Sequence, residues 1–411
     1  MGEGKAPRAG QRDAAQAPRP ADGSPVRVGL VCYAVSSGVV VVAVAFIAAI
    51  VKTDRAFFNF FARWDGEHYA TICRDGYSYD PNRGSIVAFF PAYPLLARPL
   101  TWLPGVSPKA ALVIVSHLCL AAAFVLLAAY IPQRPAPAPA GLTAYTLLAL
   151  GFVPITFFFR MAYSESLFLL VLAAAFSAMQ RQAPLGLIAL LVGFATAVRA
   201  VGVALIPPFW LALWQRSAGW GSFGLRAAAL TPVACWGLIA YMLYLGWAFG
   251  DPLAFAKTQR HWAIQTDDWP TKLTALLTLE PFWGMFDPSS PGYWRIQDPH
   301  HGPLFSLYRA NPFYFGAAVV LVAVGAVKGW LTTREWLLAA LLLAIPYATR
   351  SHEMCMASAG RFASVAFPVY LVLGHLLCRL PKGLAAVLLT LSGLVLAIYS
   401  AKFALHHAFY Y

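Results

Sequence analysis

The sequence predicts an all-α integral membrane protein. Of its 411 residues, 60% are hydrophobic and 11% are charged, whereas about 25% of residues are charged in a typical soluble domain. Apolar runs of about 17 to 25 residues, long enough to cross a bilayer, recur along the chain. Basic residues in such a protein mainly report orientation. The net charge of +13 therefore does not indicate nucleic-acid binding.

Eleven apolar runs are candidates for transmembrane helices. Runs 185–198 and 201–214 are short for full spans, so they form either two crossings or one re-entrant hairpin. Either choice adds an even number of crossings and leaves the sidedness of later loops unchanged. The runs are 28–51, 110–131, 141–159, 166–179, 185–198, 201–214, 227–249, 313–329, 336–348, 362–378 and 384–401.

The N-terminal residues 1–26 are rich in Ala, Pro, Gly and Arg and predict a disordered tail. Residues 27–411 are expected to form a single polytopic transmembrane domain. The first run is too long for the core of a signal peptide, so we interpret it as a retained anchor.

Charge distribution predicts which side of the membrane each loop occupies. The tail is basic, and the positive-inside rule places it in the cytoplasm. Alternation then puts five short basic loops on the same side, in which the only acid is Glu335. The C-terminus and two long segments, 52–109 and 250–312, fall outside. The stretches FFNFFARW and FFPAYPLLARPLTWL in the first of these segments predict interfacial helices with aromatic rings at headgroup depth.

The six cysteines show no metal-ligand spacing. Four of them lie in or beside apolar runs and are expected to be small residues of the core. Cys73 and Cys355 fall on the same predicted side, which leaves a disulfide between them open.

Polar side chains gather on the predicted outside face, most of them at the ends of apolar runs. An ionisable residue at membrane depth is costly and normally faces a polar cavity or a partner. We therefore expect a cavity at the membrane boundary, open to the outside. The candidate site residues are Arg63, Trp64, Asp65, Glu67, His68, Arg160, Tyr163, Glu165, Arg199, Gln259, Arg260, His261, Trp262, His352 and Arg361.

Several of these residues also have a simpler interpretation. Asp65 taken alone could be a solvated loop residue. Arg160, Arg199 and Arg361 could be snorkelling anchors at helix ends. Glu165 could stabilise the first turn of a helix through its charge.

The combination of motifs, however, resembles a known family. RWDGEHYATICRDGY, followed by AFFPAYPLLARPL and FFFRMAYSESLFLL, is similar to the PIG-V family of mannosyltransferases, which belong to the GT-C class of membrane glycosyltransferases. The likeness continues through ATAVRAVG, GDPLAFAKTQRHW and AGRFASVAFPVY, and it spans most of residues 55–370. It implies a GT-C fold with about eleven transmembrane helices.

The resemblance also implies a reaction. The donor would be polyprenyl- or dolichyl-phosphate mannose, and a single displacement would give an inverted, α-linked product. Asp65 would act as general base. Glu67 would orient the acceptor or bind a divalent ion, and His68 would hydrogen-bond the acceptor or the phosphate. No metal is expected to be obligatory, because two carboxylates alone are a poor site for Mg²⁺ or Mn²⁺.

Guanidinium groups suit a leaving phosphate, since their planar fork matches phosphate oxygens. In order of preference the candidates are Arg199, Arg361, Arg160 and Arg260.

The resemblance does not identify the acceptor, which is expected to be a hydroxyl of a glycolipid or of a glycan. Eukaryotic members of the family add the second mannose of the GPI anchor. The Ala/Arg-rich, Lys-poor composition favours a high-GC bacterium, which would place this chain in the bacterial inner membrane; a eukaryotic chain would lie in the ER membrane. Three alternatives remain: a GT-C transferase for another lipid-linked sugar or for a protein or cell-wall acceptor, a transporter or flippase for lipid-linked sugars, and a non-catalytic subunit.

Overall fold

The computed structural model describes residues 24–51, 56–262, 268–290, 293 and 307–405, and within these ranges every regular element is a helix. In the same ranges four helices are long and apolar enough to cross a membrane, or up to six if each of two bent pairs is one span. The structure thus agrees with a multi-pass helical membrane protein, while eleven spans stay a prediction. The expected tail lies outside the described residues as far as residue 23.

Each predicted run appears as one helix or as two successive helices. The long helices are α1 (Pro25–Ile50), α4 (Pro108–Tyr130), α15 (Leu307–Val327) and α20 (Lys382–Ala404). The shorter ones are α5 (Leu142–Phe152), α6 (Glu165–Gln180), α7 (Leu185–Val198), α8 (Ile206–Gln215), α9 (Trp220–Ala234), α10 (Trp236–Phe249), α16 (Thr333–Pro346), α18 (Ala359–Ser364) and α19 (Phe367–Leu377).

Two runs that the sequence presents as continuous are bent. The chain turns by 81° between α5 and the 3₁₀ helix η5 (Pro154–Arg160), and by 51° between α9 and α10. Proline explains both breaks, because it removes a backbone donor and clashes with the preceding turn. Pro154 opens η5, and Pro232 lies in the last turn of α9.

The runs 185–198 and 201–214 form a helical hairpin. α7 ends at Val198, the backbone of the next residue, Arg199, is extended, and the chain returns through η6 (Ala200–Leu205) into α8. Gly202 permits this close return, because an added Cβ would lie 2.5 Å from the carbonyl carbon of Ala195. The hairpin therefore carries Arg199 at its tip.

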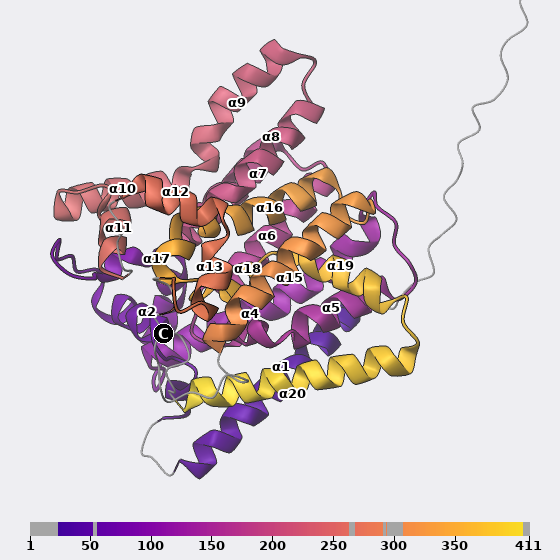
Figure 1. Cartoon of the computed structure of the whole chain (residues 1–411). Coiled ribbons are helices and arrows are strands. Elements are labelled where there is room, and N and C mark those ends of the chain that lie inside the picture. Colours follow the sequence, from indigo (N-terminus) through magenta and orange to yellow (C-terminus); the bar gives the residue numbers. More distant parts are fainter. Residues whose placement is uncertain (1–23, 52–55, 263–267, 291–292, 294–306, 406–411) are drawn as a thin grey trace, which may run out of the picture.

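A central bundle supports the rest of the molecule. α4 packs against α1 and α6, α5 packs against α19, and α20 crosses α1 and packs against it (Figure 1). η5 brings Phe157, Phe158 and Phe159 into the core, where the first two contact Phe403 of α20. The bend after α5 thus places aromatic residues where a straight helix would not.

Short helices gather at one end of the bundle, where α2, α11 and α17 lie near one another in Figure 1. The two long loop segments contribute η1 (Phe57–Phe60), α2 (Asp65–Asp75), η2 (Ile86–Ala88), α3 (Ala92–Ala97), η3 (Arg98–Trp102), α11 (Ala254–Lys257), η7 (Thr258–His261), α12 (Trp269–Leu277), α13 (Glu280–Trp283) and η8 (Gly284–Phe286). Outside these segments, η10 (Tyr347–Ser351) and α17 (His352–Met354) follow α16, and η4 (Ile131–Gln133) follows α4. Trp102 and Leu103 are exposed, as interfacial anchors would be, but Phe60 and Phe61 of FFNFFARW are buried in the core. Cys73 and Cys355 are free thiols.

A buried ion pair joins α4 to α16. Arg134, just after α4, contacts both carboxylate oxygens of Glu335 at 2.6 and 2.8 Å, and both side chains are 0% exposed. Tyr130 donates a further hydrogen bond to Glu335 at 2.6 Å, and Glu335 completes a capping box with Thr332. Arg134 falls in one of the short basic loops of the sequence-based topology, and the structure buries it as the partner of Glu335, the one acid in those loops.

Replacing Glu335 with Gln should strongly destabilise the protein, because it leaves the Arg134 charge buried without its counter-charge. Removing one partner of a buried ion pair costs about 3–5 kcal/mol. Thermal unfolding in detergent measures this. Lys109→Gln, which breaks the more exposed Lys109–Glu67 pair, should cost about 1 kcal/mol or less. Similar losses from both variants would contradict the expectation.

Candidate functional site

A cavity of about 1050 Å³ lies among the short helices at this end of the bundle. Pockets for drug-sized ligands span about 300–1,000 Å³, so this cavity has room for a large ligand. Its walls come from α2, the segment 88–90, Tyr163, the tip of the α7–η6 hairpin, α11 with η7, and the stretch from Leu342 to Val365. Of the predicted site residues, it is lined by Trp64, Asp65, His68, Tyr163, Arg199, Gln259, His261, Trp262 and Arg361.

Asp65 opens α2 and presents its carboxylate to the cavity. Its side chain is 29% exposed. The preceding residue, Trp64, has φ 46°, a left-handed conformation that is a strained outlier for a bulky side chain. This backbone turn directs the start of α2, and with it Asp65, toward the cavity.

A chain of charged contacts holds Asp65 in place. Arg361 of α18 contacts Oδ2 of Asp65 at 2.5 Å through Nη1, and Oε1 of Glu165 at 2.5 Å through Nε. Glu165 is 0% exposed and also contacts Arg199 at 2.5 Å. The Arg361 guanidinium lies 4.4 Å from the centroid of the Tyr163 ring, a cation–π geometry. Arg361 therefore joins one cavity carboxylate to one buried carboxylate.

The segment that leads to Arg361 has an unusual backbone. η10 is a turn of π-helix, which is often found at functional sites. Cys355, Met356 and Ser358 then have φ values of 47°, 61° and 63°. Non-glycine residues in this region are uncommon. Strain therefore accompanies both partners of the Asp65–Arg361 ion pair.

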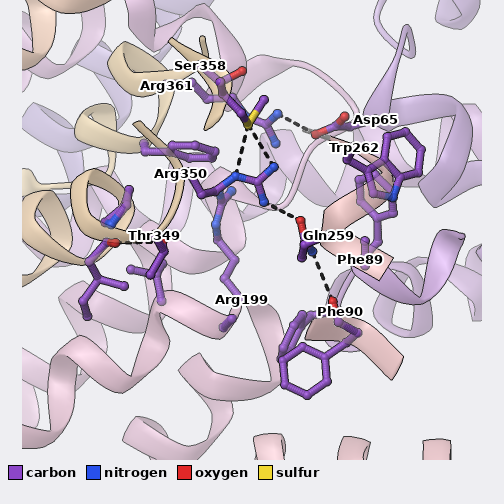
Figure 2. Close-up of a pocket in the computed structure, with 18 of the residues that line it drawn as sticks. Asp65, Phe89, Phe90, Arg199, Gln259, Trp262, Thr349, Arg350, Ser358 and Arg361 are labelled. Atoms are coloured by element: carbon purple, nitrogen blue, oxygen red, sulfur yellow. Dashed lines mark hydrogen bonds and ion pairs between the residues drawn. The ribbon is translucent and has the colours of Figure 1, made fainter. Parts of the chain in front are cut away.

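The sequence-based analysis missed Arg350, which also lines the cavity. Its Nη1 donates to Oε1 of Gln259 at 2.5 Å, and its Nε and Nη2 lie 3.2 and 3.0 Å from Sδ of Met354 (Figure 2). Arg350 lies two residues beyond the apolar run 336–348. The rule that selected other ionisable residues at run ends could have found it.

One wall of the cavity is aromatic. The His68 ring stacks on Phe89 with centroids 4.9 Å apart and meets Trp262 edge-on at 5.1 Å. Burial lowers the pKa of His68, and this effect outweighs the opposite effects of Asp65 and Glu67. Burial also raises the pKa of Tyr69 to about 12. Its phenol donates to Ser164 at 3.0 Å. Both groups are therefore neutral at pH 7.

Two predicted ligands are buried away from the cavity. Arg160 is fully buried and donates to Ser36 and Ser37 of α1 at 2.8 and 3.2 Å. Arg63 is buried and donates to the backbone carbonyl of Ala404 at 3.0 Å. Both guanidiniums link parts of the bundle, because the bend at η5 and the turn before α2 direct them inward.

Three further candidates also lie outside the cavity lining. Glu67 contacts Lys109 at 2.6 Å; it cannot share a face with Asp65, since residues two apart point in different directions on a helix. Arg260 is near the surface and donates to the carbonyl of Pro81 at 3.1 Å. His352 is buried, 3.6 Å from Glu280. Among the described residues no group of three or more His, Cys, Asp or Glu is placed to hold a metal ion.

The two carboxylates that contact Arg361, those of Glu165 and Asp65, should contribute differently to the stability of the fold. Glu165→Gln removes the anion shared by two guanidiniums at a fully buried position, so we expect a loss of about 3–5 kcal/mol. Asp65→Asn acts at a partly exposed position, where an ion pair contributes about 1 kcal/mol or less. Denaturant unfolding of both variants tests this, and a larger loss for Asp65→Asn would contradict it.

The pKa of His68 predicts a pH dependence. A base with a lowered pKa in the folded state binds fewer protons there than in the unfolded chain. The folded state should therefore lose stability as pH falls below about 6.5, until the folded pKa is passed. His68→Phe keeps a ring against Phe89 and removes this titration. Between about pH 7.5 and 5, the unfolding temperature of the variant should fall less than that of the wild type. An equal fall in unfolding temperature for the variant and the wild type would show that His68 does not cause the pH dependence.

Searches of the sequence find no matching protein-family model and no matching curated protein. Within the described residues, the cavity lining provides the carboxylate of Asp65, three guanidiniums, an aromatic wall and apolar side chains.

Proposed function

We propose that this protein is a membrane-embedded glycosyltransferase. It would move mannose from a polyprenyl- or dolichyl-phosphate-mannose donor to a hydroxyl of a glycolipid or glycan acceptor. The observation that carries the proposal is the Asp65 carboxylate, held at 2.5 Å by Arg361 on the wall of a large cavity that also presents Arg199. The sequence RWDGEHY around Asp65, which resembles PIG-V mannosyltransferases, favours mannose as the sugar.

In the proposed reaction the acceptor hydroxyl attacks the anomeric carbon of the donor sugar. The new carbon–oxygen bond forms as the bond from the anomeric carbon to the phosphate oxygen breaks. Asp65 takes the hydroxyl proton as general base, and the lipid phosphate leaves with the electron pair. A β-linked donor would give an α-linked product, as the resemblance implies. Arg361 contacts Oδ2 of Asp65, so Oδ1 can receive the proton.

The geometry favours Arg199 among the guanidiniums selected to stabilise the leaving phosphate. Arg199 lines the cavity at the hairpin tip and is 13% exposed in its side chain. A fixed cation stabilises developing negative charge strongly in a site that excludes water. Arg361 has a different role, since its hydrogen bonds to two carboxylates make it a positioning residue for Asp65. Arg160 and Arg260 are not supported as ligands, because neither lines the cavity.

A GT-C fold with about eleven spans and an extracytoplasmic site accommodates these features. The two loop segments assigned to the outside both contribute to the cavity, and a lipid-borne donor requires a site at the membrane boundary. We place the protein in the bacterial inner membrane, with the ER membrane as the equivalent for a eukaryotic chain. The proposal invokes no metal.

The test is a transfer assay followed by mass spectrometry. Purified protein in detergent receives polyprenyl-phosphate mannose and a panel of mannosyl glycolipids. The wild type should add one hexose, and Asp65→Asn should reduce the rate at least about 100-fold, since a positioned base contributes about 10²–10⁴. Asp75→Asn is the matched control, because Asp75 ends the same helix and is 53% exposed.

Product from Asp65→Asn at the wild-type rate would remove Asp65 from the role of base. If the reconstituted protein instead moves lipid-linked sugar across vesicle membranes and forms no new glycosidic bond, it is a flippase.

A further inference from the structure

The cavity has a polar side and an apolar side, and two arginines lie where they meet. α16 contributes Leu342, Ile345 and Pro346 to the lining, and Arg350 lies in η10, the π-helical turn that follows α16. An apolar strip therefore leads along one helix directly to a guanidinium.

The facing element repeats this arrangement. Arg199 immediately precedes η6, and Ala200, Val201 and Val203 of η6 line the same cavity. α16 packs against η6. Two apolar strips therefore lie side by side, each with an arginine adjoining it.

The two guanidiniums contact the same aromatic ring. The Cζ atoms of Arg199 and Arg350 lie 5.7 and 5.9 Å from the centroid of Phe362. Figure 2 shows Arg199 and Arg350 near one another, with Asp65 and Arg361 on the far side of Arg350. Two guanidiniums at the end of an apolar strip match the chemistry of an anionic headgroup on a hydrocarbon chain.

We propose that Arg350, together with Arg199, binds the phosphate of a lipid phosphate whose hydrocarbon chain lies along α16 and η6. This inference rests on the proposed function, which it deepens by assigning the donor's phosphate site to a residue outside the recognised motifs. Arg350 hydrogen-bonds the amide oxygen of Gln259 and the thioether of Met354. These two acceptors are neutral, and a phosphate oxygen accepts a stronger, charge-assisted hydrogen bond from a guanidinium than either of them does.

Charge in the cavity supports this assignment. The described lining contains three guanidiniums, those of Arg199, Arg350 and Arg361, and the carboxylate of Asp65. Glu165 lies behind the wall and contacts two of these cations, Arg199 and Arg361. These five groups together carry one net positive charge, which a bound phosphate offsets.

Binding of farnesyl phosphate, a short lipid phosphate without sugar, tests the site independently of transfer. Inorganic phosphate and farnesol are the comparison ligands, and affinity is measured by isothermal titration on the full-length protein in detergent. The wild type should bind farnesyl phosphate more tightly than either comparison ligand. Arg350→Gln should weaken this binding about 10- to 100-fold, the scale of a lost hydrogen bond to a charged group.

Two further variants and a control sharpen the test. Arg350→Lys keeps the charge and loses the planar fork, so its affinity should lie between those of the wild type and Arg350→Gln. Ile345→Trp narrows the space beside the apolar strip. It should weaken the binding of farnesyl phosphate and leave the affinity for inorganic phosphate unchanged. Arg74→Gln is the control, because Arg74 near the end of α2 is 66% exposed. This variant should bind farnesyl phosphate with the affinity of the wild type.

Unchanged affinity in both Arg350 variants would overturn the proposal, and so would equal affinity of the wild type for inorganic and farnesyl phosphate, which would indicate a site for a free anion. Arg350→Lys keeps the test decisive if Arg350→Gln does not fold. Loss of binding in Arg350→Gln without sugar transfer by the wild type would support the lipid-phosphate site and reject the glycosyltransferase.

Discussion

The geometry of the cavity depends on the guanidinium of Arg361. It joins Asp65 of α2 to Glu165 of α6, each at 2.5 Å, so that three segments distant in sequence meet at one side chain. Burying these charges has a large desolvation cost, which only mutual contacts and hydrogen bonds offset. Displacing α6 would therefore deprive both Arg361 and Arg199 of their shared buried carboxylate, and displacing α18 would remove the contacts of Arg361 with both acids. Arg199 extends the same constraint to the hairpin tip through its contact with Glu165.

Backbone strain is concentrated around this contact. Trp64 directly precedes Asp65 in a left-handed conformation, and three left-handed residues lie between α17 and Arg361. Such conformations cost about 1–3 kcal/mol each and persist only where the surrounding structure imposes them. The ion pair and the packing of Tyr163 against Arg361 supply that constraint. The protein thus maintains a fixed carboxylate in a cavity at the expense of local stability, as is typical of functional sites.

Two other buried arginines also have polar partners, but they lie away from the cavity. Arg134 and Glu335 form a fully buried pair at the α4–α16 junction, and no described cavity residue takes part in it. Arg160 is also fully buried, but neutral hydroxyl and carbonyl oxygens surround it. Buried polar groups in an apolar environment must find partners. Burial of a charge therefore does not by itself identify a functional residue; access to the cavity distinguishes Arg361 and Arg199 from these two.

The sequence by itself determined the structural class and selected most of the polar segments that line the cavity. Composition and run length predict a helical membrane protein, and most polar segments chosen at run ends do contribute to one cavity. Depth along a helix follows from the position in a run, but the direction of a side chain around the helix depends on bends and neighbours. Pro154 bends the chain and sends Arg160 into the core, while the π-helical turn after α16 brings Arg350 to the cavity. Only the tertiary structure could separate these two arginines, because packing between distant segments decides which way each guanidinium points.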